Sequence, residues 1–152
     1  MTDRPAADPF AGLVVSTSIP PSYDDLAELF ARAEFPPGYR AWPFRNPLFT
    51  VSVRTDEGRL VAYSSLHPMA GGAALEWTDL AVDPGFQNRG IGTELGQMVI
   101  REARRILATS GERWLRLYAK PRRNLADRYK RQYGFETVDG DELLGLKIYP
   151  HK

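Results

Sequence analysis

The chain has 152 residues, a formal net charge of +1 and 43% hydrophobic residues, which is typical of one globular domain with a core of its own. It contains no cysteine, which excludes disulfides, thiolate nucleophiles and thiolate metal sites, so catalysis must use oxygen and nitrogen groups. The charge gives no reason to expect nucleic-acid or membrane binding, and no metal site, transmembrane segment or signal peptide is indicated, so we expect a cytoplasmic protein.

The first half of the chain predicts a tail, a strand, a helix and a hairpin. Residues 1–11 are rich in Pro, Ala and Asp and are expected to be a flexible tail on a single domain at residues 12–152. Gly12–Ile19 alternates and is β-branched, which favours a strand. Ser22 is expected to cap a helix with one apolar face. The elements expected next are an irregular segment or short helix at Phe35–Pro47 and a hairpin of Leu48–Thr55 and Arg59–Leu66.

The second half predicts alternating strands and helices. A glycine turn at Met69–Ala73 leads into a strand at Ala74–Val82, and an amphipathic helix runs from Gly90 to about Thr109. These elements predict a right-handed parallel crossover from Leu75 to Ala119, within an α/β sandwich that has a mixed sheet. The remaining elements are expected to be a strand at Arg113–Ala119, a helix at Asn124–Tyr133, and paired strands at Phe135–Val138 and Leu143–Tyr149.

The most informative segment is the glycine-containing loop that reads Gln-Asn-Arg-Gly-Ile-Gly. It lies between a predicted strand and a predicted helix start, where backbone N–H groups and the helix dipole favour an anion. A side chain at Gly90 or Gly92 would hold phosphate oxygens away from those donors, whereas Gln87 and Arg89 can add side-chain donors. The loop therefore predicts a pyrophosphate-binding cradle formed by Gln87, Asn88, Arg89, Gly90, Ile91 and Gly92.

Two familiar nucleotide-binding loops do not fit this segment. A P-loop requires Gly-Lys-Ser/Thr, but Thr93 and Glu94 follow Gly92. A dinucleotide-binding fold requires glycines directly after its first strand and a series of βαβ units, and only one such unit is predicted. The remaining match is Gln/Arg-x-x-Gly-x-Gly/Ala after a strand that ends in Leu80–Pro84, which reads Leu-Ala-Val-Asp-Pro. In this respect the chain resembles the GNAT superfamily of acyl-CoA-dependent N-acyltransferases.

A second motif supports this resemblance. Some forty residues after its glycine loop, the family usually carries a helix with a tyrosine five residues before Gly-Phe, and Tyr129 precedes Gly134-Phe135 at that spacing. Both motifs lie within residues 74–136. The resemblance implies the GNAT fold, which has a mixed and mostly antiparallel central sheet of about seven strands flanked by helices. Its central parallel strand pair splays apart and holds the pantetheine arm of coenzyme A.

The resemblance implies an N-acyltransferase, most simply an acetyltransferase that moves an acetyl group from acetyl-CoA to a primary amine of a small molecule, peptide or protein. Transfer would be direct, in a ternary complex without a metal, and a homodimer is compatible with it. The alternative is a non-catalytic acyl-CoA-binding or regulatory module. The implied cofactor-binding residues are the backbone of Leu80, Ala81 and Val82 for pantetheine, Gln87, Asn88, Arg89, Gly90, Ile91, Gly92 and Thr93 for the pyrophosphate, and Asn124 at the next helix start.

The resemblance also implies two catalytic roles. Tyr129 matches a general acid that protonates or hydrogen-bonds the departing thiolate, and Tyr133 competes for that role. Glu76 lies eleven residues before Gln87, where some family members carry a general-base glutamate, and Asp79 is the alternative base. Strand alternation predicts two faces, one with Trp77 and Asp79 and the other with Glu76, Thr78, Leu80 and Val82.

Two further groups of residues have alternative interpretations. The first is a basic group, which either forms a solvated helix face or attracts the phosphorylated end of coenzyme A. An aromatic segment forms either ordinary core or the wall of the acceptor site that the family places there, and its arginines would favour an acceptor with a carboxylate or phosphate. The basic group is Lys120, Arg122, Arg123, Arg128, Lys130 and Arg131, and the aromatic segment contains Phe35, Tyr39, Arg40, Trp42, Phe44 and Arg45.

Overall fold

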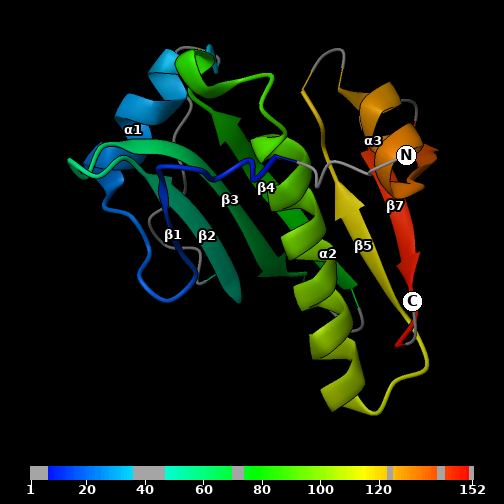
Figure 1. Cartoon of the computed structure of the whole chain (residues 1–152). Helices are drawn as coiled ribbons and strands as arrows, with labels where there is room; N and C mark the ends of the chain where they lie inside the picture. Colours follow the sequence, from blue (N-terminus) through cyan, green and yellow to red (C-terminus); the bar gives the residue numbers. More distant parts are fainter. Residues whose placement is uncertain (1–6, 36–46, 70–73, 123–124, 140–142, 151–152) are drawn as a thin grey trace, which may run out of the picture.

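The computed structural model describes residues 7–35, 47–69, 74–122, 125–139 and 143–150. They form a seven-stranded sheet in the order β1-β2-β3-β4-β5-β7-β6 (Figure 1). The strands are β1 (Val14–Ser16), β2 (Phe49–Arg54), β3 (Leu60–Pro68), β4 (Ala74–Val82), β5 (Leu115–Ala119), β6 (Glu136–Asp139) and β7 (Leu143–Ile148), and the helices are α1 (Tyr23–Arg32), the 3-10 helix η1 (Pro84–Phe86), α2 (Ile91–Ser110) and α3 (Ala126–Tyr133).

Helix α1 covers one face of the sheet, and α2 and α3 cover the other. Adjacent residues of β3 mark the two faces, because Tyr63 packs with α1 whereas Ala62 packs with Ile91 of α2. Tyr129 of α3 belongs to the same apolar cluster as Val99 of α2. The expected fold class, a mixed and mostly antiparallel sheet flanked by helices, is confirmed. Within the described ranges, no helix is long and apolar enough to cross a bilayer.

The parallel strands β4 and β5 pair over the first residues of β4 and the last residues of β5. Their register runs from Ala74 opposite Arg116 to Trp77 opposite Ala119, although β4 continues to Val82. Beyond that point the two strands diverge (Figure 1), which confirms the splayed pair that the resemblance implied. The last part of β4 therefore pairs with no described strand on its β5 side, and its backbone groups there are left for another partner.

A β-bulge in β4 corrects the predicted alternation of its side chains. The register with β3 shifts at this point, and Asp79 has a left-handed backbone with φ 63°, a conformation that aspartate tolerates better than most residues. As a result Trp77 and Leu80, three residues apart, both pack in the cluster that includes α2. The prediction that Glu76 and Leu80 share a face is therefore wrong, because Glu76 alternates with Trp77 and points to the α1 side.

Most predicted elements are confirmed, with ends that differ by a few residues. Strand β4 has the predicted bounds, and Ser22 caps α1 by accepting a hydrogen bond from the N–H of Asp25 at 3.2 Å. Strand β1 is shorter than predicted. Most of the predicted irregular segment Phe35–Pro47 and of the turn Met69–Ala73 lies outside the described residues, and so does Asn124.

The described part of the expected N-terminal tail contacts the domain. Phe10 packs against the apolar cluster that contains Val51 and Ile91. The carbonyl of Ala11 accepts a hydrogen bond from Arg89 Nη2 at 3.1 Å. Residues 7–11 thus lie next to the loop that precedes α2, and residues 1–6 lie outside the described ranges.

Candidate active site

The loop predicted to bind phosphate leads directly into helix α2. Asn88 and Gly90 both have left-handed backbones, with φ 63° and 87°, and Gly90 is the N-cap of the helix. The first helical hydrogen bond runs from the N–H of Glu94 to the carbonyl of Gly90 at 3.0 Å. The three N–H groups between them precede the hydrogen-bonded ladder and have no intrahelical partner. Together with the helix dipole, these donors favour an anion at this point.

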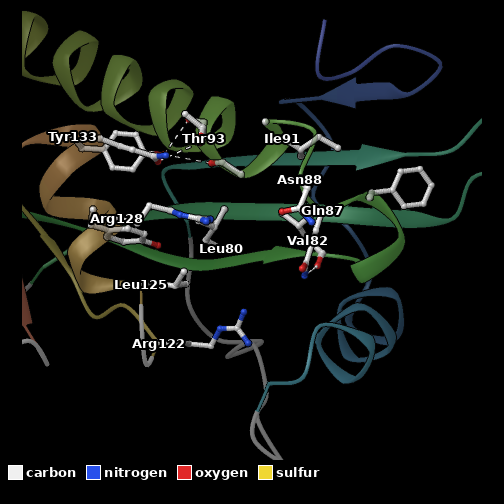
Figure 2. A pocket seen from close by; sticks show the side chains of 15 residues that line it. Leu80, Val82, Gln87, Asn88, Ile91, Thr93, Arg122, Leu125, Arg128 and Tyr133 are labelled. Carbon is white, nitrogen blue, oxygen red and sulfur yellow. Dashed lines mark hydrogen bonds between the residues drawn. The ribbon is translucent and has the colours of Figure 1, made fainter. Parts of the chain in front are cut away.

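A cavity of about 550 Å³ lies between this loop, the end of β4 and helix α3 (Figure 2). Apolar side chains of β4, the loop and start of α2, and polar side chains of α3 all contribute to its wall. It connects the predicted phosphate cradle to Tyr129. The lining residues are Leu80, Val82, Phe86, Gln87, Asn88, Gly90, Ile91, Gly92, Thr93, Arg122, Leu125, Arg128, Tyr129, Gln132 and Tyr133.

Tyr129, the predicted general acid, lines this cavity although only 5% of its surface is exposed. Its ring stacks on Trp77 with centroids 4.6 Å apart and planes at 5°, which holds the phenol in one orientation. Burial raises the pKa of the phenol, with a smaller raising effect from Tyr133 and opposing effects from Arg122 and Arg128. The hydroxyl is therefore protonated at neutral pH and can donate a hydrogen bond into the cavity.

Tyr133, the competing candidate, already uses its hydroxyl within the protein. The hydroxyl donates to the carbonyl of Thr93 at 3.1 Å, and the ring packs edge-on against Trp77 at 5.4 Å between centroids. Burial raises the pKa of this phenol to about 12, although the hydrogen bond at Thr93 opposes the shift. The Thr93 hydroxyl also bonds Gln132 Oε1 at 3.2 Å. Tyr133 and Gln132 thus tie α3 to the start of α2.

A second cavity, of about 150 Å³, adjoins the first. Leu80, Arg122, Leu125 and Tyr129 line both cavities, so the two cavities meet beside these residues. The predicted phosphate cradle lies at the other end of the larger cavity. The remaining residues that line the smaller cavity are Phe35 after α1, Trp77, Thr78 and Asp79 of β4, and Lys120 and Pro121 after β5.

The two predicted base carboxylates differ in position. Asp79 lines the smaller cavity, whereas Glu76 is not among the residues that line either cavity and lies opposite His67 of β3. A chain of polar side chains joins the two regions. Thr78 Oγ1 donates to Asp79 Oδ2 at 3.4 Å and lies 2.8 Å from Ser65 Oγ. Ser65 Oγ in turn lies 3.0 Å from His67 Nε2, so the network extends from the cavity to the cross-strand neighbour of Glu76.

Three residues predicted to contact a cofactor use their side chains elsewhere. The guanidinium of Arg89, which is not among the lining residues, lies 5.5 Å from the ring centroid of Phe86 and bonds the N-terminal segment. Ala81 is buried against α1, which leaves only its backbone as a candidate contact. Gln87 lines the larger cavity, but its side-chain Nε2 donates to the carbonyl of Val82 at 3.0 Å.

One face of α3, together with its N-cap residue, contributes more side chains to the cavity than the sequence motifs predict. Leu125, Arg128, Tyr129, Gln132 and Tyr133 all line the larger cavity, at the i, i+3, i+4, i+7 and i+8 spacing of a single helix face. The sequence motifs predict no role for Leu125 or Gln132 and include Arg128 only in the basic group. Extending the helical period outward from Tyr129 would have identified all of them.

Asp83 holds the end of β4 that leads into the loop. Its carboxylate accepts hydrogen bonds from Arg32 Nε at 2.7 Å, from Arg59 Nη2 at 2.9 Å and from the N–H of Gly85 at 2.9 Å. Burial works to raise the pKa of this carboxyl, but the three donors outweigh burial and hold the pKa below its ordinary value. The carboxylate therefore joins α1, the β2–β3 hairpin and η1 beside the site.

Comparison with known protein families gives one match. The model of the acetyltransferase (GNAT) family matches residues 18–135, which is most of the chain. No curated protein sequence matches the chain significantly.

Solved structures share the fold at low sequence identity. The GNAT family N-acetyltransferase YhbS from Escherichia coli, in complex with CoA, is 15% identical with a TM-score of 0.62 over 97% of this chain and 84% of that chain. The ribosomal-protein-S18-alanine N-acetyltransferase from Escherichia coli is 18% identical with a TM-score of 0.58 over 90% and 94%. N-acetylglutamate synthase from Neisseria gonorrhoeae, with coenzyme A and N-acetyl-glutamate, is 20% identical with a TM-score of 0.65, over 92% of this chain but 35% of that chain.

Proposed function

The chain belongs to the acetyltransferase (GNAT) family, and on this premise we propose that it transfers an acetyl group from acetyl-CoA to a primary amine. The observation that carries the proposal is the cavity that runs from the start of α2 to Tyr129, where it meets the smaller cavity. A donor in the first cavity and an acceptor in the second would meet at that tyrosine. Direct transfer in a ternary complex needs no covalent enzyme intermediate.

The residues of the larger cavity fit a coenzyme A diphosphate at the loop. An added Cβ at Gly92 would lie 3.7 Å from Val82 Cγ2, and both residues line the cavity, so the glycine keeps the space before the N–H donors open. Arg128 lines the same cavity, and no ion pair engages it among the described residues. The pantetheine arm would then follow β4 past Leu80, where that strand pairs with no described neighbour on its β5 side.

The reaction forms one C–N bond and breaks one C–S bond. The amine nitrogen attacks the thioester carbonyl carbon, and the C–S electron pair leaves with the sulfur. Burial raises the pKa of Tyr129 far above the value of about 8.5 for an ordinary thiol, so complete proton transfer from phenol to thiolate is unfavourable. A hydrogen bond from the Tyr129 hydroxyl to the developing thiolate is the role that fits.

The acceptor nitrogen loses two protons: the one that it loses after attack can end on the thiolate, and the ammonium proton that it loses before attack needs a base near the smaller cavity. Asp79 lines that cavity and is bonded to Thr78, so we assign the base role to Asp79. Glu76, the first candidate from the resemblance, is the alternative, because the polar network through Thr78 and Ser65 extends toward it.

The test is release of free thiol from acetyl-CoA by the purified protein, with a panel of primary amines and with no amine. We expect thiol release that depends on an amine, together with a product heavier by one acetyl group in mass spectrometry. Acetyl-CoA binding without amine-dependent release would favour the rival function, a non-catalytic acyl-CoA-binding module. Absence of acetyl-CoA binding in calorimetry would overturn both functions.

A further inference from the structure

The smaller cavity combines charges of both signs in a small space. Lys120 and Arg122 line it beside Asp79, and among the described residues neither cation has a carboxylate within ion-pair distance. Resting on the proposed acetyltransferase function, we propose that the acceptor is a compact amine that carries an anionic group, a carboxylate or a phosphate, which Arg122 and Lys120 bind.

Arg122 is held in place before any ligand binds. Its guanidinium carbon lies 4.0 Å from the ring centroid of Phe35, and Nη1 donates to the carbonyl of Ala33, the C-cap of α1, at 2.9 Å. A guanidinium has five N–H donors, and capping α1 occupies one of them. Nε is buried without a hydrogen-bond partner in the described part of the chain. A carboxylate or phosphate is the ligand that such a fork of donors binds best.

The contacts of Arg122 place this charge on the acceptor side. Arg122 lines both cavities, but Phe35, which supports its guanidinium, lines only the smaller one. Lys120 likewise lines only the smaller cavity. Arg128, in contrast, lines only the larger cavity, where the phosphates of coenzyme A would lie. Arg128 thus belongs to the larger cavity and Lys120 to the smaller one, and Arg122 lies where they meet, with its support on the smaller side.

The size and walls of the smaller cavity restrict the acceptor further. Its volume of about 150 Å³ equals roughly five water molecules at about 30 Å³ each, which suits an amine, a short spacer and one anionic group. The rings of Phe35, Trp77 and Tyr129 form apolar walls for the spacer. Asp79 on the β4 wall attracts the ammonium. The ammonium of a zwitterion can therefore pair with Asp79 while its anionic group pairs with Arg122 and Lys120.

Matched amine pairs test this proposal on the unaltered protein. The pairs are O-phosphoethanolamine with ethanolamine, and β-alanine with β-alaninamide, assayed by thiol release from acetyl-CoA. We expect kcat/KM to be about 10- to 100-fold higher for the anionic member of at least one pair, which is the range for a charge-assisted hydrogen bond. The pair with the larger ratio tells whether phosphate or carboxylate is preferred. Equal or faster reaction of both uncharged members would overturn the proposal while leaving the acetyltransferase function intact.

Two variants that each remove one positive charge test whether the preference for the anionic amine depends on Arg122. Arg122→Gln should abolish the preference for the anionic amine, because kcat/KM should fall more for the anionic member of the pair than for the uncharged member. Arg131→Gln removes the same charge from the exposed side of α3, where it lines neither cavity, and should keep the preference. A preserved preference in folded Arg122→Gln would overturn the assignment, and if that variant does not fold, the comparison on the unaltered protein decides. No thiol release with any amine would overturn the proposed function and this proposal together.

Discussion

Gly92 is a residue at which binding can be separated from folding. An added Cβ would meet nothing closer than Val82 Cγ2 at 3.7 Å, so the backbone accepts a side chain there. An aspartate would place a carboxylate and extra bulk in front of the N–H donors of α2. We expect Gly92→Asp to weaken coenzyme A binding by about 3 kcal/mol or more, on the scale of an unpaired charge at a buried site, as measured by calorimetry.

The control for this prediction is Gly92→Ala, which adds the Cβ without the charge. Alanine is favoured over glycine in a helix by up to about 1 kcal/mol, so this variant should be at least as stable as the unaltered protein and should lose less affinity than Gly92→Asp. Unchanged coenzyme A affinity in a folded Gly92→Asp protein would show that the phosphates bind elsewhere.

Tyr129 and Tyr133 are expected to respond differently to loss of a hydroxyl. Tyr129→Phe keeps the ring stacked on Trp77 and removes only the hydroxyl that we propose donates to the leaving sulfur, so kcat should fall about 10²–10³-fold with little change in thermal stability. Tyr133→Phe loses the hydrogen bond to the carbonyl of Thr93, which should cost about 1 kcal/mol of stability and leave kcat within a few-fold. The reverse pattern would transfer the catalytic role to Tyr133.

Asp79 and Glu76 can be compared by isosteric amides. Asparagine tolerates the left-handed backbone of residue 79 as aspartate does, so Asp79→Asn should keep the bulge of β4. We expect it to lower kcat by about 10²–10⁴-fold, the usual contribution of a general base, with coenzyme A affinity unchanged. Glu76→Gln should have a smaller effect in the same steady-state assay. A larger loss for Glu76→Gln would restore the base assignment that the resemblance first implied.

Local backbone geometry around the candidate site was easier to predict than the direction of its side chains. The loop around Gly90 and Gly92 follows from glycine content and a helix start, which are local properties. The direction of a long side chain is decided by its neighbours in space, so the sequence could not show that Arg89 turns to Phe86 and Ala11. Nor could it show that Arg122 reaches the end of α1.

At the scale of elements, Gly96 sets how closely α3 and β4 approach α2. An added Cβ would overlap the ring and hydroxyl of Tyr133 and lie 2.8 Å from Trp77 Cη2. Overpacking costs about 1–3 kcal/mol and the helix-propensity gain offsets up to about 1 kcal/mol of it, so we expect Gly96→Ala to lower the free energy of unfolding by up to about 2 kcal/mol. Denaturant titration measures the loss. Gly92→Ala is the matched control, because it makes the same change in the same helix where there is room, and equal stability of the two variants would contradict the close packing at Gly96.

The elements themselves were largely predictable, and the bulge in β4 was not. The run Ala74–Val82 is apolar and β-branched enough to predict a strand with the observed bounds, and α2 has a clear helical period. Alternation, however, assumes an unbroken strand. The extra residue at Asp79 inverts the faces of everything after it, so the positions of Leu80 and Val82 were assigned to the wrong side relative to Glu76. An aspartate in a strand is a weak signal of such a bulge.

At the scale of the whole molecule, the arrangement of the cavities depends on long-range packing. The splay of β4 and β5 was expected from a family resemblance, because no spacing in the sequence encodes the distance between two strands. The pocket beside it also needs Phe35 at the end of α1 and Lys120 after β5, residues that lie 85 positions apart in the chain. Lys120 and Arg122 could therefore be recognised from the sequence only as members of a basic group, and their place in the smaller cavity could not be predicted.

Asp83 connects these parts of the molecule and should make its stability depend on acid. Because the folded pKa lies below the unfolded value of about 3.9, the stabilisation is complete above that value and is lost as pH falls through the folded pKa. Asp83→Asn should lower the free energy of unfolding at pH 7 by about 2–4 kcal/mol, and the difference should shrink toward pH 2. Asp25→Asn is the control. It breaks an ion pair with Arg54 in which the Asp25 side chain is 40% exposed, so it should lower the free energy of unfolding by at most about 1 kcal/mol. Denaturant titrations of the unaltered protein and the two variants from pH 7 to pH 2 measure both losses of stability. If the stability difference between Asp83→Asn and the unaltered protein stays constant across that range, the charge of the Asp83 carboxylate does not stabilise the fold.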